Sequence, residues 1–98
     1  MDFKVVFTEP FCSDLEEILE HLAAQDPTAA NKLGNRAIDL CEALSFFPER
    51  YPRLRRRPTI RRLMVGKYYK VFYRIKRAER LVEILRLWDG RRGSDPRF

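Results

Sequence analysis

The sequence contains few of the residues that build metal centres, disulfide frameworks or membrane spans. Two cysteines and one histidine occur among 98 residues, fewer than the four Cys and His ligands of an ordinary structural zinc site. Cys12 and Cys41 are also too few for a disulfide framework, so we expect reduced thiols that pack within the fold. No apolar run approaches the roughly 18 residues that span a bilayer, and the N-terminus has no secretory signal pattern. These absences predict a cytoplasmic protein with no metal, no cofactor and no membrane partner.

Length and composition predict one small globular domain over residues 1–98. The hydrophobic fraction is 45% and the aromatic fraction is 12%, as in a folded protein. A domain of this size hides only about 65% of the surface that its unfolded chain exposes. It can build one modest core with little room for an enclosed ligand, so we expect a functional site on the surface.

Positive charge is concentrated in the second half of the chain. Residues 1–49 carry 3 basic and 10 acidic side chains, whereas residues 50–98 carry 17 basic and 4 acidic side chains. Six arginines fall within ten positions: Arg53, Arg55, Arg56, Arg57, Arg61 and Arg62. Such a field attracts phosphate backbones or acidic peptides without distinguishing between them, and a merely solvated basic run is the alternative.

Two amphipathic helices are expected in the first half. After a short strand at 4–7, apolar residues between positions 11 and 22 recur at the spacing of one helical face. Asp26 followed by Pro27 is a typical helix start, and the apolar stripe that follows continues until Pro48 ends the second helix. The connection between the helices is short, which predicts an antiparallel hairpin.

A basic, proline-rich linker at 49–59 and three strands are expected in the second half. The strand-like runs cover 61–65, 68–75 and 81–88, and short turns join them, which predicts an antiparallel meander. The order β-α-α-β-β-β predicts an α+β fold in two layers. The helical hairpin would pack on one face of a mainly antiparallel sheet.

Alternation along the middle strand assigns its side chains to two faces. The set expected under the helices is Tyr69, Val71, Tyr73 and Ile75. The set expected on the other, open face is Tyr68, Lys70, Phe72 and Arg74. Cations mixed with aromatic rings can hold a ribose-phosphate chain or a partner peptide, although ordinary strand packing explains the same alternation.

Common catalytic motifs are absent from the sequence: there is no glycine-rich phosphate loop, HExxH, CxxC pair or GxSxG elbow. His21 has acidic neighbours and no nucleophile nearby in sequence, so we expect an ordinary surface histidine. A metal-free ribonuclease remains an alternative, because arginines and lysines can stabilise the charged transition state of phosphodiester cleavage. Glu83 and Asp89 are single carboxylates, more typical of ion-pair partners than of a general base. Catalytic residues therefore stay unassigned.

Six segments, each weak alone, occur in an informative order and spacing: 3–8, 14–18, 47–50, 61–68, 71–74 and 82–92. Together they resemble the RelE/ParE superfamily of bacterial toxins from type II toxin–antitoxin modules over almost the whole chain. The resemblance implies a growth-arresting toxin, of the kind associated with plasmid stabilization. It also implies a cognate antitoxin whose C-terminal segment wraps the toxin in a hetero-oligomer.

Two activities occur in that superfamily: RelE-like members cleave mRNA in the ribosome, whereas ParE-like members resemble inhibitors of DNA gyrase. This chain has Asp89 where many relatives have a histidine, and no tyrosine or histidine follows Arg92. The long helical hairpin and the turn at 47–50 are closer to ParE-like members. The leading interpretation is a gyrase inhibitor; the alternatives are a ribosome-dependent mRNA endonuclease and a non-toxic partner-binding member of the fold.

Seven basic residues are candidates for binding the target or the antitoxin: Arg61, Arg62, Lys70, Arg74, Arg86, Arg91 and Arg92. The resemblance to RelE-like members carries over to Arg61 or Arg62, to Lys70, and to Arg91 or Arg92. An acidic, partly disordered peptide could neutralise these cations while burying its own apolar residues. The role of the arginines at 53–57 is left open.

Overall fold

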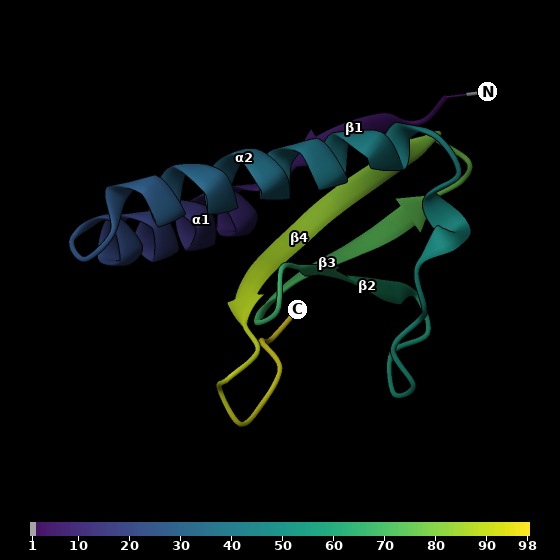
Figure 1. The fold of residues 1–98 in the computed structure, drawn as a ribbon. Coiled ribbons are helices and arrows are strands. Elements are labelled where there is room, and N and C mark those ends of the chain that lie inside the picture. Colours follow the sequence, from purple (N-terminus) through teal and green to yellow (C-terminus); the bar gives the residue numbers. More distant parts are fainter. Residues whose placement is uncertain (1) are drawn as a thin grey trace.

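The computed structural model describes residues 2–98 and has an α+β fold in two layers (Figure 1). Its elements are strand β1 (Lys4–Phe7), helices α1 (Glu9–Ala23) and α2 (Pro27–Glu42), the 3-10 turns η1 (Ala43–Ser45) and η2 (Pro48–Arg50), and strands β2 (Ile60–Val65), β3 (Tyr69–Lys76) and β4 (Leu81–Asp89). The expected order of helices and strands is confirmed. α2 stops short of the expected end at Pro48, because the chain leaves it through η1 and then reverses at Phe47, which has a left-handed φ of 51°.

The two helices form the expected hairpin. Asp26 begins α2 as predicted: its carboxylate accepts a hydrogen bond of 3.1 Å from the Ala29 amide, and Pro27 at the first helical position has no N–H to satisfy. α1 starts after Thr8, whose hydroxyl donates to the Ile84 carbonyl of β4 at 2.7 Å. This bond ties the start of the helical layer to the sheet.

The sheet has the strand order β1-β4-β3-β2. β1 and β4 pair in parallel, whereas the pairs β2–β3 and β3–β4 are antiparallel. The chain therefore places its first strand beside its last, an arrangement that short-range sequence signals leave undetermined. A bulge between Phe72 and Tyr73 of β3 leaves Leu85 of β4 without a partner, and it separates the regular pairing of the two halves of the β3–β4 ribbon.

The core lies between the helices and one face of the sheet. Phe11 of α1 and Cys41 of α2 pack there with Val71, Tyr73 and other buried residues of the strands. The predicted alternation of β3 is confirmed, since Tyr69, Val71, Tyr73 and Ile75 all belong to this core or pack against it. Burial of these apolar surfaces is the main force that joins the two layers.

The opposite face of the sheet is not fully open, as the sequence analysis expected it to be. Phe72 points to this face yet is completely buried, and the C-terminal tail (residues 93–98) turns back over it (Figure 1). The physical reason is that burying a phenylalanine side chain at the centre of the face, away from water, lowers the free energy of the folded chain. Alternation alone could not show that the same chain supplies the cover.

The two cysteines differ in environment. Cys41 is buried, and burial raises the pKa of its thiol to about 12, so it is an unreactive packing thiol as expected. Cys12 is exposed, so the expectation of a packing role is wrong there: its side chain lies on the solvent side of α1. Within residues 2–98, no helix has the length and apolarity that crossing a membrane requires.

Candidate functional site

The side of the sheet away from the helices carries aligned rows of cations and aromatic rings, and we name it the basic face. One row runs across three strands through Arg62, Phe72 and Arg86, which are register partners. In the next row Lys70 pairs with Trp88. Side chains that pair directly across antiparallel strands share a face. β2, β3 and β4 therefore place an aromatic ring between two arginines at the centre of this face.

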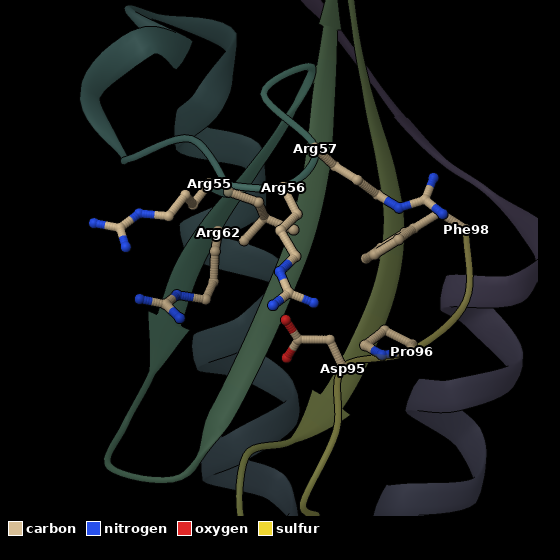
Figure 2. Close-up of a pocket in the computed structure, with 8 residues that line it drawn as sticks. Arg55, Arg56, Arg57, Arg62, Asp95, Pro96 and Phe98 are labelled. Carbon is tan, nitrogen blue, oxygen red and sulfur yellow. The ribbon is translucent and has the colours of Figure 1, made fainter.

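Beside these rows lies a hollow of about 490 Å³, which we name the arginine cavity. Its lining residues come from the 54–57 loop, from β2 and from the C-terminal tail: Leu54, Arg55, Arg56, Arg57, Arg62, Asp95, Pro96 and Phe98. Figure 2 shows Arg56 reaching toward the Asp95 carboxylate and Arg57 extending along the Phe98 ring. Within residues 2–98, the four arginines form none of the ion pairs described below. The cavity therefore holds an excess of positive charge.

The 54–57 loop is fixed to the edge of the sheet. The Leu54 amide donates to the Ile60 carbonyl at 2.8 Å, and the Ile60 amide donates to the Arg57 carbonyl at 2.9 Å. Arg53 forms a single β-bridge with Arg61. Backbone bonds thus hold the loop against β2 while its arginine side chains stay exposed.

The C-terminal tail closes one side of the cavity through four contacts with the basic face and one with the 54–57 loop. Lys70 Nζ lies 3.2 Å from Asp95 Oδ1, Trp88 Nε1 donates to the Ser94 carbonyl at 2.7 Å, and Arg86 Nη1 donates to the Arg97 carbonyl at 3.1 Å. The Phe98 ring meets the Phe72 ring edge-on at 5.2 Å. The fifth contact stacks the Arg57 guanidinium 5.8 Å above the Phe98 ring.

Two of the predicted site arginines on the strands, Arg74 and Arg86, are held in ion pairs. Arg74 Nε lies 2.7 Å from Glu83 Oε1 on the neighbouring strand. Arg86 grips Asp14 of α1 with two nitrogens at 2.7 and 2.9 Å, and the Leu87 amide donates to the same carboxylate at 3.1 Å. These hydrogen bonds to Asp14 raise the pKa of Arg86 further above its usual range. Arg86 therefore joins α1, β4 and the tail through its hydrogen bonds.

Arg91 and Arg92, the two predicted arginines after β4, have different surroundings. Arg91 forms a bidentate pair with Asp89, with Nη2 2.8 Å from Oδ2. The hydrogen bond from Arg91 lowers the pKa of Asp89 below its ordinary value, and the same bond raises the pKa of Arg91. Arg92 instead stacks 4.4 Å from the centre of the Trp88 ring. Of the two, Arg92 keeps its charge available to a partner.

Arg61 lies apart from the other predicted residues. Its register partner is Tyr73, which faces the helices, and its Nη1 donates to the carbonyls of Glu49 and Tyr51 at 3.1 and 2.7 Å. Arg61 thus fastens the loop after η2 to the sheet. The basic face brings together Arg62, Lys70, Arg74 and Arg86, with Arg92 at its margin, whereas Arg61 acts on the other side.

Three features of the site escaped the sequence analysis: the arginines at 55–57 as cavity walls, Asp95 as a carboxylate in the same lining, and Phe98 as the cover of Phe72. A signal for the tail is present in the sequence, since an acid and an aromatic residue lie three positions apart in the segment Asp95–Phe98. Such a short motif carries no information about where it docks. The residues that this segment contacts come close to it only when the antiparallel strands have paired.

The charge chemistry of the basic face suits binding. Guanidinium groups stay protonated at any cellular pH, so they hold anions firmly but do not transfer protons. The nearby carboxylates of Glu83 and Asp89 are each engaged by an arginine. In the described part of the chain, no group of three His, Cys, Asp or Glu side chains gathers in a way that could hold a metal ion.

A second, smaller hollow of about 350 Å³ lies between α1 and the end of β4. His21, Tyr69, Asp89, Arg91 and Arg92 are among its lining residues. The expected surface position of His21 agrees with its exposure. This hollow nevertheless brings a titratable imidazole and a phenol near two arginines.

The fold and the site define a small two-layer α+β protein with a cationic face. The chain belongs to the family described as ParE toxin of the type II toxin–antitoxin system, parDE, whose model matches residues 5–93. The resemblance to the RelE/ParE superfamily is therefore confirmed. No curated protein matches the chain.

Solved toxin–antitoxin structures share the fold. The chromosomal ParDE system from P. aeruginosa has a TM-score of 0.75 and 20% identity, covering 89% of this chain and 95% of that chain. The RelBE2 toxin–antitoxin complex from Mycobacterium tuberculosis has a TM-score of 0.65 and 22% identity, covering 91% of this chain and 99% of that chain. At these identities the similarity concerns the fold alone. It includes both a ParE and a RelE system.

Proposed function

We propose that this toxin arrests bacterial growth by binding and inhibiting DNA gyrase, and that a cognate antitoxin neutralises it. The observation that carries the proposal is the arginine cavity, where four arginines line one surface hollow beside a single carboxylate side chain. Arginine binds carboxylates and phosphates with geometric specificity, and it is common in protein interfaces. A cationic binding surface of this kind suits a protein that blocks a macromolecule.

The carboxylates of β4 support inhibition over cleavage. Cleavage that uses a 2′-hydroxyl needs a proton acceptor and a proton donor as well as cations. Glu83 is bonded to Arg74 at 2.7 Å, and Arg91 holds the pKa of Asp89 below its ordinary value. A carboxylate stabilised in its charged form is a weaker base than a free one. Neither of these two carboxylates of β4 is therefore well suited to act as a general base.

Charge also supports an acidic antitoxin segment as the partner. The half of the chain that forms β2, β3, β4 and the tail carries 17 basic and 4 acidic residues. An acidic peptide laid on the basic face would gain ion pairs in a partly dehydrated setting, and steering would speed its encounter. The resulting complex would be a hetero-oligomer of toxin and antitoxin.

The experiment measures supercoiling by purified gyrase with increasing amounts of the toxin. We expect loss of supercoiling with the native chain and a several-fold weaker effect with Arg62→Ala, because Arg62 projects into the cavity and forms no ion pair within residues 2–98. Glu16→Ala, an exposed change on α1, is the matched control and should behave as the native chain does. Unchanged supercoiling at a large molar excess of folded toxin would refute the gyrase target.

One observation favours mRNA cleavage in the ribosome as a second candidate function: the hollow that brings His21, Tyr69, Arg91 and Arg92 together. An imidazole can exchange protons near neutral pH, and two arginines can stabilise a phosphate in the transition state. Induced expression followed by mapping of messenger ends tests this function. Cleaved messages that disappear with His21→Ala would favour the nuclease, whereas DNA-damage signalling without cleavage would favour gyrase. The absence of any growth defect with folded protein would support a non-toxic binding member.

A further inference from the structure

The C-terminal tail has the chemistry of a bound ligand of the basic face. It supplies a carboxylate at Asp95 and an aromatic ring at Phe98, and each meets a complementary group. Asp95 lies 3.2 Å from Lys70 Nζ, and the Phe98 ring packs 5.2 Å from Phe72. The backbone between them is held as a peptide would be, because Arg86 donates to the Arg97 carbonyl.

The tail neutralises the surface only in part. Arg55, Arg56, Arg57 and Arg62 line the cavity and Lys70 adjoins it, whereas Asp95 is the one carboxylate among the lining residues. The tail also brings a further cation of its own, Arg97. A peptide with more carboxylates than the tail would therefore gain more electrostatic free energy at the same place.

Release of the tail from the basic face also requires little free energy. Residues 93–98 form no helix or strand, and all except Pro96 are exposed or nearly so, with Phe98 at 41% exposure. Segments with few buried contacts open locally at a small fraction of the free energy of global unfolding. The body of the sheet would stay folded when the tail leaves.

We infer that residues 94–98 of the tail are a built-in occupant of the basic face beside the arginine cavity, and that an acidic peptide with a carboxylate three positions before an aromatic residue displaces them. That this peptide belongs to the antitoxin rests on the function proposed above. Displacement exposes Phe72 to the incoming aromatic ring and the cavity arginines to the incoming carboxylates. The tail thereby lowers the apparent affinity for any ligand that binds only the open state.

The surface favours a peptide over a nucleic acid. Nucleic acid strands without base pairing need exposed aromatic faces on which bases stack. The Trp88 ring already has the Arg92 guanidinium 4.4 Å and the Arg86 guanidinium 5.5 Å from its centre. The tail already places a carboxylate, a proline and a phenyl ring beside the cavity, and these are the parts of a peptide.

The experiment uses the full chain and a labelled, capped pentapeptide Ser-Asp-Pro-Glu-Phe, the tail sequence with its arginine changed to glutamate. Binding is measured by fluorescence anisotropy. We expect the double variant Asp95→Asn with Phe98→Ala to bind the probe about tenfold more tightly than the native chain, as removal of a competitor that is about 90% bound predicts. Adding Arg56→Ala and Arg62→Ala to it should reverse the gain. Ser94→Ala, which keeps the backbone carbonyl that Trp88 binds, is the matched control and should leave the affinity unchanged.

Trp88 is the single tryptophan of the chain and touches the tail, so its emission reports tail release directly. Asp95→Asn alone preserves the shape of the side chain at position 95. In this variant the Trp88 emission should shift toward that of the double variant. Equal probe affinity in native and tail-released chains would overturn the inference, even if gyrase inhibition were observed. A ten-nucleotide oligo-dT strand that gained more affinity than the pentapeptide would overturn the choice of a peptide. Failure of the gyrase assay alone would refute the proposed target and leave the tail result intact.

Discussion

Replacing Asp14 tests how α1 is joined to the basic face. The Asp14 carboxylate receives three hydrogen bonds: two from Arg86, at 2.7 and 2.9 Å, and one from the Leu87 amide, at 3.1 Å. The side chains of Arg86 and Asp14 are 24% and 14% exposed, respectively. Asp14→Ala would leave a largely buried guanidinium without its anion and a strand amide without its acceptor.

The expected cost lies between the limits for exposed and buried pairs. Breaking a buried ion pair costs about 3–5 kcal/mol, whereas a surface pair contributes at most about 1 kcal/mol. The partial exposure of this pair suggests about 2 kcal/mol, and the orphaned amide adds about 1 kcal/mol. We therefore expect Asp14→Ala to lower the free energy of unfolding by about 3 kcal/mol. For a domain of this length that loss corresponds to a fall in melting temperature of roughly 12–24 °C.

Urea unfolding followed by far-ultraviolet circular dichroism measures the change, with Trp88 emission as a second probe. Asp14→Asn should cost less than Asp14→Ala, because its amide oxygen can still accept from Leu87. Glu16→Ala on the exposed side of α1 should change stability by less than about 0.5 kcal/mol. A loss below about 1 kcal/mol for Asp14→Ala would refute the structural role. Arg86→Ala removes the same contact with Asp14, so a loss of binding in that variant includes a loss of stability.

Further predictions concern the loop after η2, the start of the tail and acid stability. The Tyr73 hydroxyl donates to the Pro48 carbonyl at 2.6 Å in the core, so Tyr73→Phe should cost about 1–2 kcal/mol in urea unfolding; no loss would contradict the bond. A side chain at Gly90 would meet a backbone carbonyl at 2.5 Å, so Gly90→Ala should shift the tail and change Trp88 emission; an unchanged spectrum would contradict this. Arg91 lowers the pKa of Asp89, so this pair stabilises the fold above pH of about 4 and the contribution is lost as pH falls through the lowered value. In a plot of the urea midpoint against pH, Asp89→Asn should remove the decrease below a pH of about 4 that this pair causes. An unaltered plot would refute the stabilising role of the pair.

The interaction between Arg91 and Asp89 illustrates what local sequence can show. The two residues lie two positions apart, and the expectation that Asp89 is an ion-pair partner is met by their bidentate contact. The Asp26 cap of α2 is a second example, since donor and acceptor are three positions apart. Contacts of this range depend on local geometry that residue type predicts well.

The seven candidate cations show where local reasoning stops. Arg61 and Arg62 are neighbours, yet strand alternation sends one toward the helices and the other into the arginine cavity. Arg86 finds its partner 72 positions away in α1. Whether a cation stays without an ion-pair partner depends on residues far away in the sequence. Spacing along the sequence does not predict which of these residues come close.

By itself the sequence determined the order of helices and strands, the two faces of β3 and the family, because hydrophobic periodicity and turn residues act over a few positions. Tertiary structure alone decided that β1 lies beside β4, which cations are neutralised, and that the tail covers Phe72. These outcomes depend on chain ends and loops that meet across the fold, where the balance of burial and charge is set by three-dimensional proximity.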